Sequence, residues 1–412
     1  MKTGTIGPAI LVTAAFIGPG TVFTATMAGA NFGFSLLWAL LFAVASTLIL
    51  QEMSARLGIV TGKGLGENIR AAASNPIARG AAIILVVSAI VVGNGAYQSG
   101  NISGASLGLA ALSKSLGMSD PLAQTGLGAG WFWPGIIGAT AFALLASGKY
   151  RVIEKSLITL VALMSLAFVG SLILLQPDYF ALLKGLLIPQ LPDGSMLTVI
   201  ALIGTTVVPY NLFLHASSAS VKWSSPEHLA NARRDLIVSI PLGGLISVAI
   251  VSTAATAFFA QATPITGVAD LAPALRPVAG NWAASLIALG LFAAGVSSAV
   301  TAPLAAAYAL SGILNIDKRM DSFAFRLIWL SILIIGVLVS SAGYRPVEVI
   351  WFAQVANGLL LPIIAAFLLW TMNSERLKQY RNRWPSNLMG FAVLLVTLML
   401  SGRSLLSAFG AL

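Results

Sequence analysis

Runs of about 20 mostly apolar residues recur along the whole chain, with short polar segments between them. Each run is long enough to cross a hydrocarbon core about 30 Å thick, since a helix rises about 1.5 Å per residue. Only 9% of the residues are charged, whereas soluble domains carry about 25%. We therefore predict an all-α integral membrane protein. Eleven transmembrane helices are expected, near residues 7–31, 34–57, 80–111, 132–148, 152–175, 195–221, 236–261, 281–313, 323–342, 346–371 and 386–408.

The net charge of +10 raises the question of a nucleic-acid partner, but the basic residues are distributed as in a membrane protein. With the N-terminus in the cytoplasm, 18 of the 23 Lys and Arg residues fall on the cytoplasmic side. The five others are Lys114, Lys184, Arg276, Arg345 and Arg403. This asymmetry follows the positive-inside rule. We expect a multi-pass protein of the inner (plasma) membrane, with a cytoplasmic N-terminus, an extracytoplasmic C-terminus and contacts with membrane lipid, not nucleic acid.

No segment between the spans is long or polar enough to form a soluble domain, so residues 1–412 are interpreted as one transmembrane domain. The longest breaks, near 58–79, 176–194 and 262–280, suit loops or short surface helices. The absence of cysteine excludes disulfides and thiolate metal sites. All 13 acidic residues fall in loops or at span ends, and the chain has no HExxH or GxSxG pattern. We therefore expect neither an enzyme nor a cofactor, and no residue pattern indicates an oligomeric state.

Two of the predicted spans contain a proline-centred interruption. The sequence Gly18-Pro19-Gly20 interrupts the first, and Pro209 interrupts the sixth within IGTTVVPYNLFLHASS, residues 203–218. The interrupted spans are the first and the sixth, five positions apart along the chain, so the two helices run in opposite directions. Paired interruptions in inverted halves are typical of the midplane site of a transporter, where unwound backbone faces a cavity. We predict a transporter that binds its solute between the breaks; the alternative is that each proline only kinks a helix.

Three stretches resemble the natural-resistance-associated macrophage protein (NRAMP) family of divalent-metal transporters. LLWALLFAVASTLILQEMSARLGIVTGKGLGE, residues 36–67, is similar to the second span of that family and the loop after it. VVPYNLFLHASS, residues 207–218, resembles its sixth-span motif MPHNLYLHS, and GLFAAGVSSAVTAP, residues 290–303, its eighth span. The resemblance implies a LeuT-type fold with alternating access around broken helices 1 and 6. It also implies two inverted five-helix repeats, residues 1–175 and 195–371, and one additional helix at 386–408.

The chain departs from the family where the resemblance places the metal site. Gly18 stands in the position of the metal-binding Asp, and Thr21 replaces the Asn of the same motif. Val208 replaces a Met that is a soft metal ligand, and Tyr210 replaces a His. Gln98 and Asn101 stand in the positions of two acids of the family's proton path. Val296 stands in the position of a Gln that helps to hold the ion.

Neutral donors and acceptors remain around the two breaks, and no set of metal ligands is expected among them. The candidate substrate-binding residues are Gly18, Pro19, Gly20, Thr21, Thr24, Thr206, Val207, Val208, Pro209, Tyr210 and Asn211. The candidates for the pathway or for coupling are Asn94, Gln98, Asn101, His215, Gln354 and Asn357.

Several of these residues also have a purely structural interpretation. Thr21 can N-cap a half-helix, and the Tyr210 hydroxyl can satisfy a loose carbonyl at the kink. His215 suits either a proton carrier or a neutral imidazole that joins two helices. Three residues share one helix face by their spacing, which suits a pathway lining or helix–helix hydrogen bonds: Asn94, Gln98 and Asn101.

The uncharged site argues against a dehydrated transition metal as cargo. A divalent ion that loses one carboxylate ligand forfeits about 8 kcal/mol of attraction at about 4 Å and an effective dielectric of about 20. The N-termini of the two half-helices, expected near Thr21 and Asn211, favour negative charge. We therefore predict a small anion or zwitterion, such as bicarbonate, a small carboxylate or an amino acid. The alternatives are a largely hydrated divalent metal ion bound with low affinity, and a non-transporting sensor on a transporter scaffold.

Overall fold

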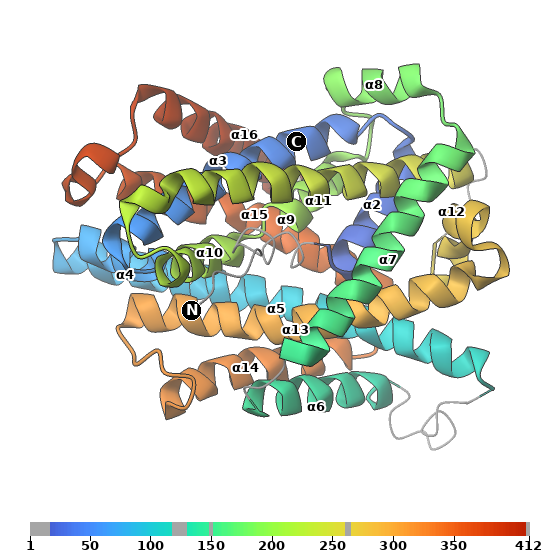
Figure 1. The fold of residues 1–412 in the computed structure, drawn as a ribbon, viewed down its shortest axis with the longest axis horizontal. Helices are drawn as coiled ribbons and strands as arrows, with labels where there is room; N and C mark the ends of the chain where they lie inside the picture. Colours follow the sequence, from blue (N-terminus) through green and yellow to red (C-terminus); the bar gives the residue numbers. More distant parts are fainter. Residues whose placement is uncertain (1–16, 118–129, 148–150, 260–264, 409–412) are drawn as a thin grey trace.

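The structure is a computed structural model that describes residues 17–117, 130–147, 151–259 and 265–408 (Figure 1). Regular secondary structure in these ranges is entirely helical. The α-helices are α2 (Pro19–Phe32), α3 (Leu37–Thr61), α4 (Leu65–Ala72), α5 (Pro76–Ser115), α6 (Phe132–Ser147), α7 (Arg151–Leu175), α8 (Tyr179–Leu187), α9 (Met196–Thr206), α10 (Pro209–Lys222), α11 (Leu229–Phe258), α12 (Val268–Ala279), α13 (Ala283–Leu314), α14 (Phe323–Ser340), α15 (Pro346–Met372) and α16 (Trp384–Ala408).

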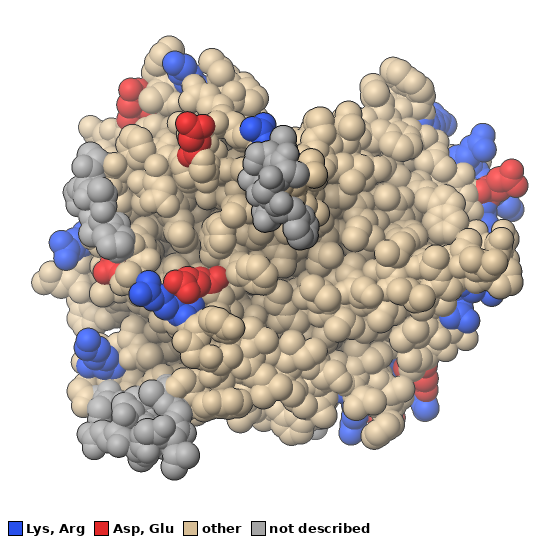
Figure 2. Space-filling view, turned by 180° about the vertical axis from the view of Figure 1, so that it is seen from behind, with Lys and Arg blue, Asp and Glu red and all other residues tan. Residues whose placement is uncertain are grey.

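The described helices have the dimensions and surface of a membrane protein. Nine helical stretches within the described ranges are long and apolar enough to cross a bilayer, and α6 is a shorter apolar helix. The first predicted span is seen as α2, while its residues 7–16 lie outside the described ranges. On the face shown in Figure 2, charged side chains gather toward the two ends and leave a broad uncharged belt between them. Such a belt is what the hydrocarbon core of a membrane requires.

The three longest predicted breaks each contain one short helix, which is α4 in the first break, α8 in the second and α12 in the third. Figure 1 shows α4 at one end of the long helices and α8 and α12 at the opposite end. The Asp178 carboxylate caps α8, because it accepts hydrogen bonds at 3.0 Å from the backbone N–H groups of Phe180 and Ala181. The short helices therefore separate onto two sides, as expected for segments that connect successive membrane crossings.

One acidic residue lies deeper in a helix than the sequence indicated. The second span was predicted to end at residue 57, but α3 continues to Thr61, so Glu52 is about two and a half turns inside it. The Glu52 carboxylate accepts hydrogen bonds from Arg56 at 3.0 Å and from Arg233 of α11 at 2.8 Å. Placing Glu52 at a span end was wrong. Its charge is nevertheless balanced by two arginines, Arg56 and Arg233.

Glycine residues allow the long helices to cross with their backbones in contact. A methyl group on Gly29 of α2 would lie 2.2 Å from the carbonyl oxygen of Val251 in α11. A methyl group on Gly58 of α3 would lie 2.1 Å from the carbonyl oxygen of Ala216 in α10. Small residues at such crossings favour helix association in membranes, where burial of apolar surface supplies little driving force. The two short helices next to the interruptions are thus each packed closely on a long neighbour.

Candidate functional site

The second predicted interruption lies between α9 and α10. Helix α9 ends at Thr206 and α10 begins at Pro209. Val207, at φ −97° and ψ 71°, and Val208, at φ −76° and ψ 121°, both have non-helical backbone. A residue before proline is disfavoured in the helical conformation, and proline has no N–H to continue the helix. The sequence thus separates two half-helices by a short unwound segment, at the predicted position.

Both half-helices begin two residues earlier than expected. Their first residues are Pro19 and Pro209, rather than residues near Thr21 and Asn211. Proline suits the first helical position because its fixed φ is helical and its missing N–H would be unpaired there. Gly18 is the N-cap of α2, and no side chain caps that helix. The interpretation of Thr21 as an N-cap is therefore wrong.

A pair of threonine hydroxyls joins α2 to α9, the helix that ends at the second interruption. Thr21 Oγ1 lies 2.8 Å from Thr205 Oγ1, which links α2 to α9. Thr24, one turn further along α2, is fully buried. The Thr206 hydroxyl instead donates to the carbonyl oxygen of Leu202 in its own helix at 3.1 Å. Thr205 therefore contacts α2 through its hydroxyl, while that of the candidate Thr206 is used within α9.

We expect Thr21→Val and Thr205→Val each to lower the melting temperature of the purified protein, because each removes a buried hydrogen bond worth about 1 kcal/mol. The melting temperature of the double variant should fall by less than the sum of the two single decreases, because the two changes remove the same hydrogen bond. Thermal unfolding of the four proteins measures this coupling. Thr206→Val is the matched control and should show no coupling to Thr21→Val; strictly additive losses for Thr21 and Thr205 would contradict the pairing.

Helix α15 brings an amide side chain to the start of α2. A methyl group on Gly20 would lie 2.2 Å from Nε2 of Gln354, so this amide packs directly on the Gly20 backbone. Pro19 packs against α5, where a methyl group on Gly104 would lie 2.2 Å from its Cβ. Asn357 lies about one turn beyond Gln354 on α15 and is also buried. Candidates from the first and last thirds of the chain therefore meet at the start of α2.

Several buried polar atoms of the predicted residues have no hydrogen-bond partner within the described part of the chain. They are Thr24 Oγ1, Asn211 Oδ1 and Nδ2, Gln354 Oε1, and Asn357 Oδ1 and Nδ2. Leaving a buried polar group unpaired costs about 1–3 kcal/mol, so native proteins rarely leave such a group without a partner. These atoms are suited to bind a polar solute or the water around it.

Tyr210 lies against Tyr97 of α5, a residue that was not among the candidates. Their ring centroids are 5.3 Å apart, with the ring planes tilted by 60°. Both residues are about 1% exposed. The available signal was spacing, since Tyr97 follows Asn94 by three residues and precedes Asn101 by four, which places it on the same helix face.

The polar face of α5 is used largely for contacts between helices. Asn94 donates to the carbonyl oxygen of Ala302 at 3.3 Å, and Gln98 donates to that of Ala299 at 3.0 Å; both acceptors lie in α13. Asn101 is buried, and its Nδ2 has no hydrogen-bond partner among the described residues. These donors favour the packing interpretation for Asn94 and Gln98, while a pathway role for Asn101 stays a prediction.

His215 is fully buried in α10 and is joined to α3. Its Nδ1 lies 2.6 Å from Oε1 of Gln51, and its Nε2 has no partner within the ranges that the structure describes. Gln51 was not predicted as a partner, because nothing in the spacing relates two residues 164 positions apart. A role of His215 in proton transfer stays a prediction.

A cation at the interruptions would meet neutral oxygen atoms. Within the described ranges, no group of three or more His, Cys, Asp or Glu side chains is placed to hold a metal ion. The first turns of α2 and α10 also contain no acidic residue. The site can therefore offer amide, hydroxyl and backbone groups, which bind hydrated ions and small polar solutes better than bare metal ions.

Comparison with known proteins identifies similar chains over nearly the full length. The family model described as natural resistance-associated macrophage protein-like matches residues 9–407. The divalent metal cation transporter MntH of Yersinia pestis (strain Pestoides F) is 29% identical over 413 residues, covering 99% of this chain and 96% of MntH. The solved structure of the Eremococcus coleocola manganese transporter matches with a TM-score of 0.77 at 22% identity, covering 97% of this chain and 86% of the other. MhsT in complex with L-phenylalanine matches with a TM-score of 0.63 at 17% identity, covering 98% and 100%. The predicted class, an all-α multi-span membrane protein with a transporter fold, is confirmed.

Proposed function

The chain belongs to the natural resistance-associated macrophage protein-like family of multi-pass membrane transporters, and from that premise we propose that its cargo is a divalent cation that keeps most of its hydration water. Its MntH relatives are named divalent metal cation transporters, which favours a cation over the small anion or zwitterion predicted first. One observation carries the proposal. Buried amide and hydroxyl groups of α2, α10 and α15 have no hydrogen-bond partner among the described residues, and the first turns of α2 and α10 contain no carboxylate.

Ligand chemistry supports a hydrated ion. Manganese and iron ions exchange their water for carboxylate, imidazole or sulfur ligands, and Gly18 and Val208 supply none of these. Magnesium dehydrates reluctantly and commonly binds through several retained water molecules. Those water molecules donate hydrogen bonds, and the side-chain oxygens of Asn211, Gln354 and Asn357 can accept them. A magnesium-like ion therefore matches this site better than a bare transition metal does.

We infer that transport follows alternating access between two inverted five-helix repeats, residues 1–175 and 195–371, with α16 as the additional eleventh span. The unwound segment at Val207 and Val208 and the start of α2 at Pro19 support this assignment, because interrupted helices of this kind form the midplane sites of such transporters. The distribution of basic residues supports a cytoplasmic N-terminus and a location in the plasma membrane.

A flux measurement tests the cargo. With purified protein in sealed vesicles, we expect saturable Mg²⁺ uptake with half-saturation on the order of 1 mM, the affinity of a weak oxygen-ligand site. Manganese at micromolar concentration should not enter, and the vesicle lumen should not acidify when it is offered. Protein-free vesicles give the leak rate. Saturable Mn²⁺ uptake at micromolar concentration would overturn the proposal that the ion stays hydrated.

A small anion is the second candidate, and the half-helix N-termini favour it. Helices α2 and α10 begin at Pro19 and Pro209, and the first turn of neither helix contains an acidic residue that would neutralise the positive end of its dipole. The unpaired amide nitrogens of Asn211 and Asn357 add hydrogen-bond donors. Uptake of bicarbonate or formate by the same vesicles, without Mg²⁺ uptake, would favour this candidate over the cation.

A further inference from the structure

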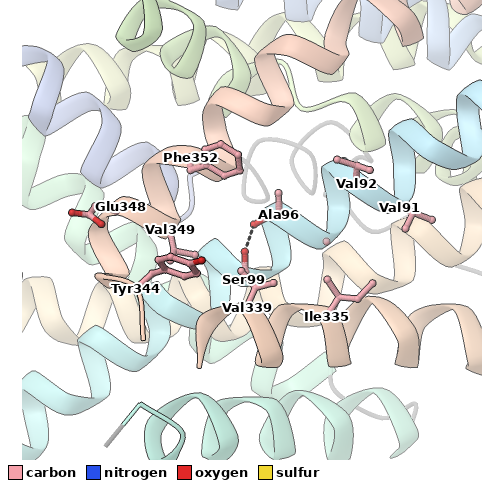
Figure 3. Close-up of a pocket in the computed structure, with 11 residues that line it drawn as sticks. Val91, Val92, Ala96, Ser99, Ile335, Val339, Tyr344, Glu348, Val349 and Phe352 are labelled. Atoms are coloured by element: carbon pink, nitrogen blue, oxygen red, sulfur yellow. Dashed lines mark hydrogen bonds between the residues drawn. The ribbon is translucent and has the colours of Figure 1, made fainter. Parts of the chain in front are cut away.

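A groove of about 630 Å³ lies between α5, α14 and α15, separate from the interruptions (Figure 3). Its lining residues are mostly small or aliphatic; those used below are Val92, Ala96, Ser99, Tyr344, Glu348 and Phe352. Val92 and Phe352 are 58% and 63% exposed, so the groove opens at the surface of the helix bundle. On α15 the groove is lined by residues 348, 349 and 352, whereas Gln354 and Asn357 are buried elsewhere on that helix.

The interior of the groove is suited to hydrocarbon. Ser99 is the polar side chain in its middle, and its hydroxyl donates to the backbone carbonyl of Ala96 at 2.6 Å. Figure 3 shows this bond directed along α5, with aliphatic side chains on both sides of the groove. On α5 the lining extends from Val91 to Ser99, a length of about 12 Å. A slot of this length without unsatisfied polar groups accommodates part of a fatty acyl chain.

One end of the groove carries charge. Tyr344 and Glu348 lie there, and the Glu348 carboxylate is 3.7 Å from the guanidinium of Arg345. The two charged side chains are 63% and 79% exposed, so both can contact a ligand. They stand at the start of α15, where a long apolar helix begins and the polar region of a bilayer is expected. An acidic and a basic group side by side complement a headgroup that itself carries both charges.

We propose that this groove binds one phospholipid with an ethanolamine headgroup, with an acyl chain along Val92, Ala96 and Phe352. The lipid phosphate pairs with Arg345, and its ammonium pairs with Glu348. The assignment rests on the apolar slot and on the charge complementarity at its end, and it does not depend on which solute the protein carries. The lipid would contact α15 away from Gln354, so its binding can be measured without transport.

The test uses the full-length protein in vesicles that contain equal amounts of phosphatidylethanolamine and phosphatidylglycerol. The protein is then extracted in mild detergent, and the lipid that it retains is identified by native mass spectrometry. Phosphatidylethanolamine should be retained in preference to phosphatidylglycerol. Ala96→Phe should reduce that retention about tenfold, because the ring occupies volume that the acyl chain needs. Ala143→Phe, on an exposed position of α6, is the matched control and should retain the lipid as the unchanged protein does.

The charged end is tested separately, so that the outcome does not depend on the folding of Ala96→Phe. Glu348→Gln and Arg345→Gln should each reduce the preference for the ethanolamine headgroup about fivefold, the effect of losing one exposed ion pair. Equal retention of both lipids by the unchanged protein would overturn the proposal. So would unaltered retention in Ala96→Phe, or a protein dimer that buries the groove and holds no lipid.

Discussion

Gly18→Asp is expected to raise the affinity for Mn²⁺ about a hundredfold and to allow uptake at micromolar concentration. A carboxylate about 4 Å from a divalent ion contributes about 8 kcal/mol of attraction at an effective dielectric of about 20. Desolvation of the ion and the carboxylate cancels most of this attraction. If about 3 kcal/mol remains, the affinity rises about a hundredfold. The backbone at Gly18, with φ −105° and ψ −175°, is extended, a conformation that any residue adopts. Aspartate is also a favourable N-cap for α2. Calorimetric titration with Mn²⁺ and the vesicle uptake assay measure the effect.

Gly18→Asn is the matched control, because it has nearly the same shape as Gly18→Asp without the charge. It should leave Mn²⁺ affinity within a few-fold of the unchanged protein. The same pair of variants distinguishes the two candidate cargoes, since aspartate should abolish uptake of bicarbonate or formate by repulsion whereas asparagine should not. If aspartate alters neither Mn²⁺ binding nor anion uptake, the start of α2 does not contact the cargo.

Gly204→Ala is expected to destabilise the protein by about 2–4 kcal/mol and to abolish transport. Its added methyl group would lie 2.1 Å from the carbonyl oxygen of Gln354 and 2.5 Å from the backbone nitrogen of Gly358. These are backbone atoms, so the substitution forces α9 and α15 apart instead of turning a side chain. Gly358 is equally close to α9, since a methyl group there would lie 2.4 Å from the Ile200 carbonyl oxygen.

Gly402→Ala provides the control for Gly204→Ala. A methyl group on Gly402 of α16 would meet no atom within 4 Å. There the change from glycine to alanine in a helix should be neutral or stabilising by up to about 1 kcal/mol. Thermal unfolding of the purified proteins gives the comparison. Equal melting temperatures for the two variants would show that the crossing of α9 and α15 relaxes at little cost.

The spans and the second interruption could be predicted because few physical factors decide them. Hydrophobic length alone places a membrane helix, and α13, at Ala283–Leu314, differs little from the predicted 281–313. Proline restricts its own backbone and that of the residue before it, so the break at Val208 and Pro209 follows from local geometry. The C-terminal end of α3 was less predictable: the span was predicted to end at residue 57, whereas the helix continues through residues 58–61 to its cap at Gly62.

The contacts within the site depend on helix rotation, which the sequence does not reveal. Adjacent residues on a helix point about 100° apart, so Thr205 and Thr206 are equally plausible partners of Thr21 until α9 is packed against its neighbours. Tyr97 and Gln51 were missed for the same reason, because their partners lie far away in the chain. Residue types indicated the neutral character of the site, and packing determined which neutral groups meet.

The glycine crossings described above have a consequence for how the protein can move. Gly29 holds α2 against α11, and Gly58 holds α10 against α3. Since backbone contacts of this kind do not slide easily, each short helix should travel together with its long neighbour as a two-helix rigid body. Opening of the site would then rotate about the unwound residues Val207 and Val208, without melting any helix.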